Sequence, residues 1–253
     1  MRMARELLLI GIGAGDPDWV TLEAVRAIEA LDVLFVVRKE DQLDDLVEAR
    51  RVVVGRHRSR PLRTVDLDDP PRPWRTTDDY PAAVRRWRQQ RLANWSAAVR
   101  AELADGQVGG FLVWGDPSLF ESTLAIVDEL VDATDDVTRR VIPGISCVHA
   151  LTARHGIPLN RVSRAVQITP ARLIADGLPG DVDDAVVMLD GKQTFALIDP
   201  TGIDIYWGAY LGTADEILIA GPLEQVRDEI VRVRAEAAER KGWMFDTYLL
   251  RRR

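Results

Sequence analysis

The sequence LLLIGIGAGDPDWVTL at residues 7–22 decides the fold class. Leu7–Ile12 is a short apolar run that ends in glycines, which is typical of a buried strand in a parallel sheet. From Thr21 onward, apolar residues recur at helical spacing with charged residues on the other face. A second strand is predicted at Asp32–Val37. Because this strand–helix–strand order requires a right-handed crossover between parallel strands, the start of the chain predicts an α/β domain.

The rest of the first half continues this alternation of strands and helices. Buried strands are predicted at Val108–Trp114 and Arg140–Ile142, and helices at Pro81–Ala104 and in a segment ending at Leu130. The segment Arg56–Tyr80 is rich in proline and arginine and has no clear period, so we predict a long loop there.

The second half has a more mixed pattern. A helix is expected after Gly144 and a closing helix at Leu223–Arg240. Four more strands are predicted, at Ala165–Thr169, Ala185–Leu189, Ile203–Leu211 and Glu216–Ala220. We therefore expect two α/β domains, residues 1–143 with a parallel sheet and residues 144–253 with a mixed sheet.

Composition limits the possible functions. With 47% hydrophobic and 29% charged residues, and apolar runs too short to cross a bilayer, the chain is expected to be globular and not a membrane protein. One cysteine excludes an internal disulfide, and three histidines without metal-ligand spacing predict no metal site. No signal-peptide pattern is present, so we expect a cytoplasmic protein. A net charge of −7 argues against a nucleic-acid partner.

The glycines at 11, 13 and 15 invite comparison with the dinucleotide-binding pattern G-x-G-x-x-G. That pattern requires its third glycine at position 16, where this sequence has Asp16. A carboxylate there would repel a pyrophosphate, and Pro17 lacks one of the amide donors that such a site needs. A nicotinamide or flavin site is therefore not expected. An ordinary strand-to-helix turn would explain the glycines but leaves the Asp-Pro pair unexplained.

Three motifs in a fixed order give a more specific signal. They are Gly11–Pro17, Gly115–Phe120 and Val141–Ser146, and together they resemble the tetrapyrrole methylase family over nearly the whole chain. This family transfers a methyl group from S-adenosylmethionine to carbons of a corrin precursor. The resemblance implies two α/β domains with the cofactor in the cleft between them, and a homodimer.

Three longer stretches narrow the resemblance to one branch of the family. Trp114–Thr123, Arg154–Arg161 and Ile205–Thr213 are similar to the branch of aerobic cobalamin synthesis that also releases an acetyl group. This implies conversion of precorrin-5 to precorrin-6A with release of acetate. The alternatives are another methylase of the same fold, acting on a different precorrin or on the diphthamide precursor, and a tetrapyrrole-binding protein without catalytic activity.

The resemblance also implies which residues contact S-adenosylmethionine, or its product S-adenosylhomocysteine. These are Ala14, Trp114, Gly115, Asp116, Leu119, Ser146, Cys147, Met188, Gly212 and Thr213. Many family members have proline in place of Ala14, which weakens that assignment. The residues themselves support the Gly115 turn, since it follows a predicted parallel strand, and open α/β sheets bind ligands at the carboxyl ends of their strands. An ordinary capped turn is the alternative.

Methyl transfer from a sulfonium is an in-line displacement that needs neither a metal nor a covalent intermediate. Loss of an acetyl group needs water and a base, for which Asp16, Asp116 and His155 are the candidates, with His57 as a further possibility. A structural role also suits His155. Cys147 is interpreted as packing beside the cofactor, because its motif does not point to a nucleophile.

Thirteen arginines crowd into residues 50–100, and codon usage in a GC-rich genome would explain much of this. A corrin precursor, however, is fringed with carboxylates, which guanidinium groups bind well. Arg58, Arg60, Arg63 and Arg85 are therefore predicted to contact the substrate. The alternative is that the helix around Arg85–Arg91 is merely a solvated face.

Overall fold

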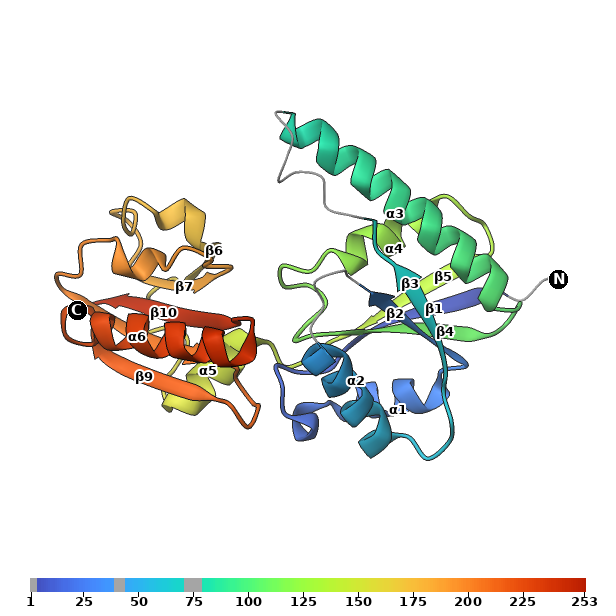
Figure 1. The fold of residues 1–253 in the computed structure, drawn as a ribbon, viewed down its shortest axis with the longest axis horizontal. Coiled ribbons are helices and arrows are strands. Elements are labelled where there is room, and N and C mark those ends of the chain that lie inside the picture. The colour runs from blue at the N-terminus through green and yellow to red at the C-terminus, as the bar shows by residue number, and fades with distance from the viewer. Residues whose placement is uncertain (1–3, 39–43, 71–78) are drawn as a thin grey trace. The chain divides into compact units, whose positions relative to one another are not determined.

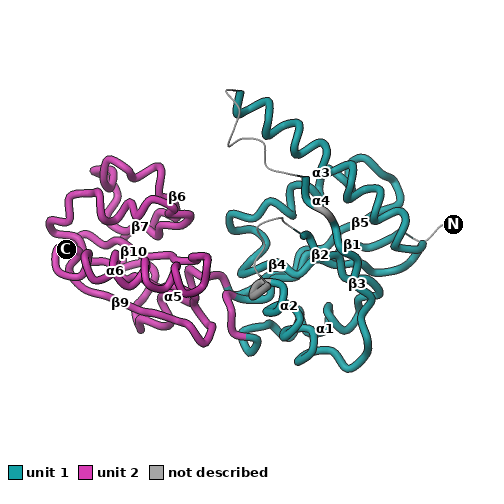
Figure 2. Tube along the Cα trace, in the orientation of Figure 1, with its two compact units in different colours: residues 1–13, 17–145 teal, residues 14–16, 146–253 magenta. Residues whose placement is uncertain are grey.

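The computed structural model describes residues 4–38, 44–70 and 79–253, in two compact units (Figure 2). The first unit comprises Met1–Gly13 and Pro17–Ile145, and the second comprises Ala14–Asp16 and Ser146–Arg253. Each unit has its own sheet and its own hydrophobic core. Among the described residues, no helix combines the length and the apolar character needed to span a bilayer.

The first unit is built on a parallel sheet of strand order β3-β2-β4-β1-β5. Its strands are β1 (Arg5–Gly11), β2 (Val33–Arg38), β3 (Arg63–Asp68), β4 (Val108–Val113) and β5 (Val137–Ile142). Helices cover both faces, which explains why Leu7–Ile10 in β1 is fully buried on both sides of the strand.

The α-helices found among the described residues of this unit divide between the two faces of the sheet (Figure 1). One face packs against α1 (Leu22–Ala30) and α2 (Asp44–His57), and the other against α3 (Tyr80–Glu102) and α4 (Thr123–Asp132). Thr21 begins α1 because its hydroxyl accepts a hydrogen bond from the Ala24 backbone N–H at 3.1 Å. A short 3-10 helix, η1 (Pro17–Trp19), precedes it.

The second unit contains a mixed sheet of strand order β6-β7-β10-β8-β9, in which only β6 and β7 are parallel. Helix α6 packs on the face of β8 that carries Trp207, and α5 packs on the face of Gly208. The elements are α5 (Cys147–His155), β6 (Gln167–Pro170), η3 (Ala171–Ile174), β7 (Asp184–Met188), η4 (Thr194–Ala196), β8 (Ile203–Ala209), β9 (Ile217–Pro222), α6 (Leu223–Lys241) and β10 (Asp246–Arg252).

The expected loop over Arg56–Tyr80 is wrong at residues 63–68, where β3 forms the edge of the first sheet. Only Val65 and Leu67 of this strand pack into the core, so its alternation was too weak to recognise beside arginines and prolines. The preceding helix α2 was not predicted either. The part of the predicted loop at residues 71–78 lies outside the described residues.

The helix at Leu223–Arg240 does not close the second unit, because β10 follows it and lies between β7 and β8. This strand escaped prediction because its apolar run is short and leads into three arginines. Two of these arginines have polar partners inside the unit. Arg251 pairs with Asp184 at 2.8 Å, and Arg252 donates to the Val182 carbonyl at 3.0 Å.

The Asp184 carboxylate gives a test of this central strand. It is fully buried and receives Arg251 at 2.8 Å and Arg161 at 3.1 Å. Asp184→Ala leaves Arg251 buried without its counter-ion and should lower the free energy of unfolding by about 3–5 kcal/mol. Asp183→Ala is the matched control, since its partner Arg164 is exposed and the loss should stay below about 1 kcal/mol. Denaturant titration measures both, and equal losses would contradict the assignment.

Candidate functional site

The three glycine motifs meet at the carboxyl edge of the first sheet. A Cβ atom added to Gly11 would lie 2.5 Å from the Gly144 backbone nitrogen and 2.9 Å from the Gly115 carbonyl oxygen. A Cβ atom added to Gly144 would overlap that same Gly115 oxygen. The backbone at the ends of β1, β4 and β5 therefore approaches so closely that only glycine fits at these positions.

Asp116 joins two of these motifs through its side chain. One carboxylate oxygen accepts a hydrogen bond from the Gly144 backbone N–H at 2.9 Å. The other accepts from the backbone N–H of Ser118 at 2.8 Å and from the Ser118 hydroxyl. Gly13 and Gly115 add a backbone bridge between the first and second motifs. Asp116 thus fixes the shape of the turn, a role that accounts for the motif without proton transfer.

The Ala14–Asp16 segment belongs with the second unit. A Cβ atom added to Gly15 would come within 2.9 Å of the Thr213 side chain, so the first motif packs closely against the Gly212-Thr213 turn. Ala14 is buried and Asp16 is half-buried in this segment. The structure therefore brings Ala14, Gly212 and Thr213 into one neighbourhood, while the catalytic role of Asp16 stays a prediction.

The residues expected at the start of α5 are held in defined positions. The Ser146 hydroxyl lies 2.9 Å from Nδ1 of His149, one turn further along. Burial raises the pKa of the Cys147 thiol to about 11, so the thiol is protonated at neutral pH. A protonated, buried thiol is a poor nucleophile, which agrees with the interpretation of Cys147 as a packing residue.

Three of the predicted cofactor contacts adjoin strained backbone. Phe120, Leu189 and Tyr210 have positive φ angles of 51°, 58° and 49°, and they lie next to or near Leu119, Met188 and Gly212, respectively. Each loop follows the end of a strand. Non-glycine residues in this conformation are costly and concentrate where loops are shaped for a ligand. The observation fits loops that hold a cofactor through their backbone.

His155 does not face a catalytic partner in this arrangement. It lies at the end of α5, with Nε2 3.0 Å from the Trp207 carbonyl oxygen and its ring edge-on to Tyr206. Nε2 is therefore the protonated nitrogen that donates this hydrogen bond. Burial lowers the pKa of His155, which keeps the ring neutral. The geometry favours the structural role. The further candidate, His57, also contacts backbone, with Nε2 2.8 Å from the Pro17 carbonyl oxygen.

Three of the four predicted substrate arginines lie at the opposite edge of the first sheet. Arg58 and Arg60 donate to the Glu29 carbonyl at 2.9 and 3.2 Å, near the end of α1. Arg63 begins β3 and pairs with Glu102 at the end of α3. Helix ends and strand starts coincide at the amino edge, away from the glycine motifs. The structure does not bring these arginines to the glycine motifs. Arg85 is exposed in the first part of α3, and its role stays a prediction.

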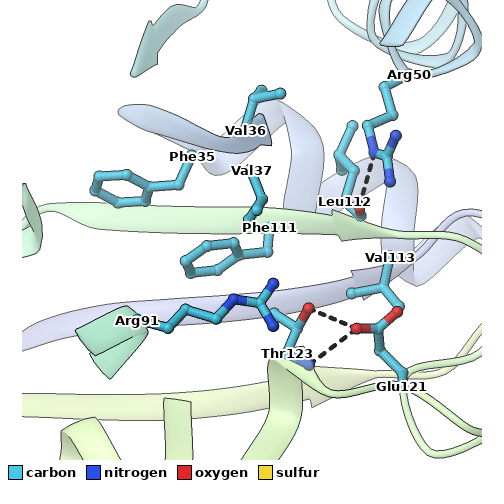
Figure 3. Close-up of a pocket in the computed structure, with 10 residues that line it drawn as sticks. All are labelled: Phe35, Val36, Val37, Arg50, Arg91, Phe111, Leu112, Val113, Glu121 and Thr123. Carbon is cyan, nitrogen blue, oxygen red and sulfur yellow. Dashed lines mark hydrogen bonds between the residues drawn. The ribbon is translucent and has the colours of Figure 1, made fainter. Parts of the chain in front are cut away.

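A small polar cavity lies at the same carboxyl edge, between β2 and β4 (Figure 3). These strands pair only at Val33–Gly109 and Leu34–Gly110 and then diverge. The cavity measures about 50 Å³ and is lined by Phe35, Val36, Val37, Arg50, Arg91, Phe111, Leu112, Val113, Glu121 and Thr123. Glu121 lies inside the stretch Trp114–Thr123 but was not among the site residues predicted from the sequence.

Arg91 is an exception to the alternative of a solvated helix face, which holds for exposed Arg85 and Arg86. It is only 2% exposed and pairs with buried Asp69 at 2.7 Å. Its guanidinium carbon lies 4.8 Å from the ring centroid of Trp87 and 4.6 Å from that of Trp95. The middle of α3 thus buries a stacked and paired arginine beside the cavity.

Comparison with known proteins agrees with these motifs. The sequence matches the tetrapyrrole (corrin/porphyrin) methylases over residues 6–227. This chain belongs to the tetrapyrrole methylase family. The family uses S-adenosylmethionine as its methyl donor.

Two relatives cover almost the whole chain. A precorrin-6A synthase (deacetylating) from Sinorhizobium sp. is 42% identical over 98% of this chain and 95% of its own length. The crystal structure of a cobalamin synthesis related protein from Corynebacterium diphtheriae has a TM-score of 0.84 and 33% identity, covering 98% of this chain and 99% of that one. The chain is therefore a homologue of precorrin-6A synthase.

A more distant structure shares the fold. A uroporphyrin-III C-methyltransferase from Thermus thermophilus, crystallised with S-adenosylhomocysteine, has a TM-score of 0.61 at 20% identity and covers 97% of this chain and 91% of its own. The predicted α/β fold of the tetrapyrrole methylase type is confirmed.

Asp116 provides the test of the glycine turn. Asp116→Ala removes the acceptor for the Gly144 N–H and should weaken S-adenosylhomocysteine binding by about tenfold or more, as expected for a lost hydrogen bond to a charged group. Arg60→Ala, at the other edge of the sheet, should leave the affinity within about twofold. Isothermal calorimetry gives both values. Similar losses for the two variants would be incompatible with this division of the sheet.

His155 predicts a pH effect on stability. Its folded pKa lies below the unfolded value, so the unfolded state takes up more protons as pH falls through the unfolded pKa of about 6.5, and stability drops. His155→Gln keeps a donor for the Trp207 carbonyl and should reduce this drop between about pH 7.5 and about pH 5.5, measured by thermal unfolding. Activity should stay within about threefold of wild type, whereas loss of a general base would cost about a hundredfold or more.

Proposed function

We propose that this protein is an S-adenosylmethionine-dependent C-methyltransferase that converts precorrin-5 to precorrin-6A with release of acetate. The observation that carries the proposal is the 42% identity to a deacetylating precorrin-6A synthase, which extends over nearly the full length of both chains. Methylases that act on other tetrapyrroles match less well, such as a precorrin-2 C(20)-methyltransferase from Sinorhizobium sp. at 27% identity over 74% of the chain.

The residues at the glycine turns suit S-adenosylmethionine. Glycines at the ends of β1, β4 and β5 let the three turns pack closely together, and Asp116 holds two of these turns in place. The residues proposed to hold the cofactor are Ala14, Trp114, Gly115, Asp116, Leu119, Ser146, Cys147, Met188, Gly212 and Thr213. When bound, the cofactor supplies an electrophilic methyl group.

The remaining demands of the reaction fall on the protein. Its residues must orient the macrocycle so that one ring carbon faces the methyl group at about 3–3.5 Å, and must exclude water from that path. Uncharged neighbours suit a sulfonium transfer, and the protonated Cys147 thiol meets that condition. We propose that exposed Arg85 pairs with a substrate carboxylate, and that the active form is a homodimer, which light scattering would test.

Incubation with precorrin-5 and methyl-labelled S-adenosylmethionine tests the assignment. We expect one labelled methyl group in each product macrocycle and one acetate per turnover, both read by mass spectrometry. Omitting the methyl donor should abolish formation of the methylated product. Methylation of another precorrin but not of precorrin-5 would assign the chain to a different branch. Absence of S-adenosylhomocysteine binding in calorimetry would instead point to a tetrapyrrole carrier.

A further inference from the structure

The cavity between β2 and β4 occupies a switch point in the topology of the first unit. The chain leaves β2 toward α2 on one face of the sheet and leaves β4 toward α4 on the other face. Adjacent strands whose connections leave on opposite faces open a crevice at their carboxyl ends, where open α/β sheets bind ligands. In this sheet the crevice opens because β2 and β4 pair only at Val33–Gly109 and Leu34–Gly110 and then diverge.

Glu121 is fixed at the mouth of this crevice by three hydrogen bonds to one of its oxygens. Oε1 accepts from the backbone N–H groups of Ser122 and Thr123 at 2.8 and 2.9 Å, and from the Thr123 hydroxyl at 2.7 Å. Oε2 receives no hydrogen bond from any residue in the described ranges. Figure 3 shows this carboxylate beside Thr123 on the lining of the cavity. One oxygen thus orients the group, and the other is available for chemistry.

Two arginines reach the cavity from opposite faces of β4 (Figure 3). Arg50 comes from α2 and donates through Nε to the Leu112 carbonyl at 3.2 Å. Burial lowers the pKa of Arg50, and the negative charge of Glu121 acts in the opposite direction. Arg91 comes from α3 and donates to the Ser122 hydroxyl at 3.0 Å. The cavity therefore combines one oriented carboxylate with fixed positive charge.

The size of the cavity suits water and not a macrocycle. A volume of about 50 Å³ holds a few water molecules, given that one needs roughly 10–15 Å³. A carboxylate, a guanidinium and a space of the size of a few water molecules can provide what hydrolysis of a carbonyl group requires: a base, an electrostatic stabiliser and room for the nucleophile.

We propose that Glu121 is the general base that activates water for release of the acetyl group, with Arg50 stabilising the oxyanion. This rests on the proposed function, and it assigns the hydrolytic half of the reaction to a residue at the same carboxyl edge of the sheet as the glycine turns.

Glu121 Oε2 takes a proton from water as the water oxygen bonds to the acetyl carbonyl carbon, and the carbonyl oxygen gains negative charge facing Arg50. The carbon–carbon bond to the macrocycle then breaks, acetic acid leaves, and the electron pair stays on the ring carbon. That carbon becomes the nucleophile that methyl transfer needs. The proton held by Glu121 passes to solvent.

Glu121→Gln is the discriminating variant, because the glutamine carbonyl oxygen can still accept the three hydrogen bonds that orient the side chain. We expect kcat for acetate release to fall by about a hundredfold or more, with KM within about threefold. S-adenosylhomocysteine affinity, measured by calorimetry, should stay within about twofold.

Glu129→Gln, within the helix α4 that begins just after Glu121, is the matched control. Its carboxylate pairs with Arg88 on the exposed side of α4, so all kinetic values should stay close to wild type. In H₂¹⁸O the wild-type enzyme should place one solvent oxygen in each acetate, as hydrolysis requires.

The outcomes separate the two proposals. Wild-type release of ¹⁸O-labelled acetate together with a silent Glu121→Gln variant that still binds S-adenosylhomocysteine supports the assignment. Wild-type kinetics in Glu121→Gln would overturn it, as would a Glu121→Gln variant that loses cofactor affinity and activity together. If wild type binds S-adenosylhomocysteine but releases no acetate from precorrin-5, the proposed function itself is wrong.

Discussion

The close approach of three backbones at Gly11, Gly115 and Gly144 is the constraint on which the first unit depends. Parallel strands do not by themselves fix the turns that follow them. Here the absence of side chains lets β1, β4 and β5 end in contact, and the Asp116 carboxylate then binds the β5 turn through the Gly144 N–H. Because this bond joins residues 28 apart in the chain, it holds the carboxyl edge as one structure.

The two edges of that sheet do different work. At the amino edge, Arg58, Arg60 and Arg63 bind carbonyls and carboxylates at helix ends. Their positive charges therefore stabilise the ends of α1 and α3. At the carboxyl edge, polar groups are placed by backbone turns and by the start of α4. The number of arginines in a segment does not tell whether they stabilise helix ends or face a ligand. The direction of each strand does tell this, because it fixes which edge of the sheet the arginines lie on.

Much of the fold was predictable because its central strands are buried on both faces and therefore form continuous apolar runs, as Leu7–Ile10 does. The edge strand β3 and the central strand β10 were not predicted, for different reasons. In β3 only alternate residues are buried. In β10 the burial of Arg251 depends on Asp184, which lies 67 residues away in the chain, and no local window contains that pairing. The motifs indicated which residue types gather at the carboxyl edge, but not that the Asp116 oxygens face backbone N–H groups.

Glu121 was not predicted as a site residue because nothing in its local sequence distinguishes it. A glutamate before Ser122 and Thr123 has the composition of an ordinary helix start, and its capping bonds are indeed ordinary. What makes it distinctive is its surroundings. The divergence of β2 and β4 leaves a small space, and Arg50 and Arg91 enter it from opposite faces of the sheet. These features arise from segments that lie far apart in the chain. The surroundings of the Glu121 carboxylate therefore depend on the topology and not on the local sequence. The hydrogen bonds to Glu121 Oε1 cap the start of α4 and at the same time fix the orientation of Oε2. One side chain therefore both stabilises the helix start and presents the oxygen proposed to act as the base.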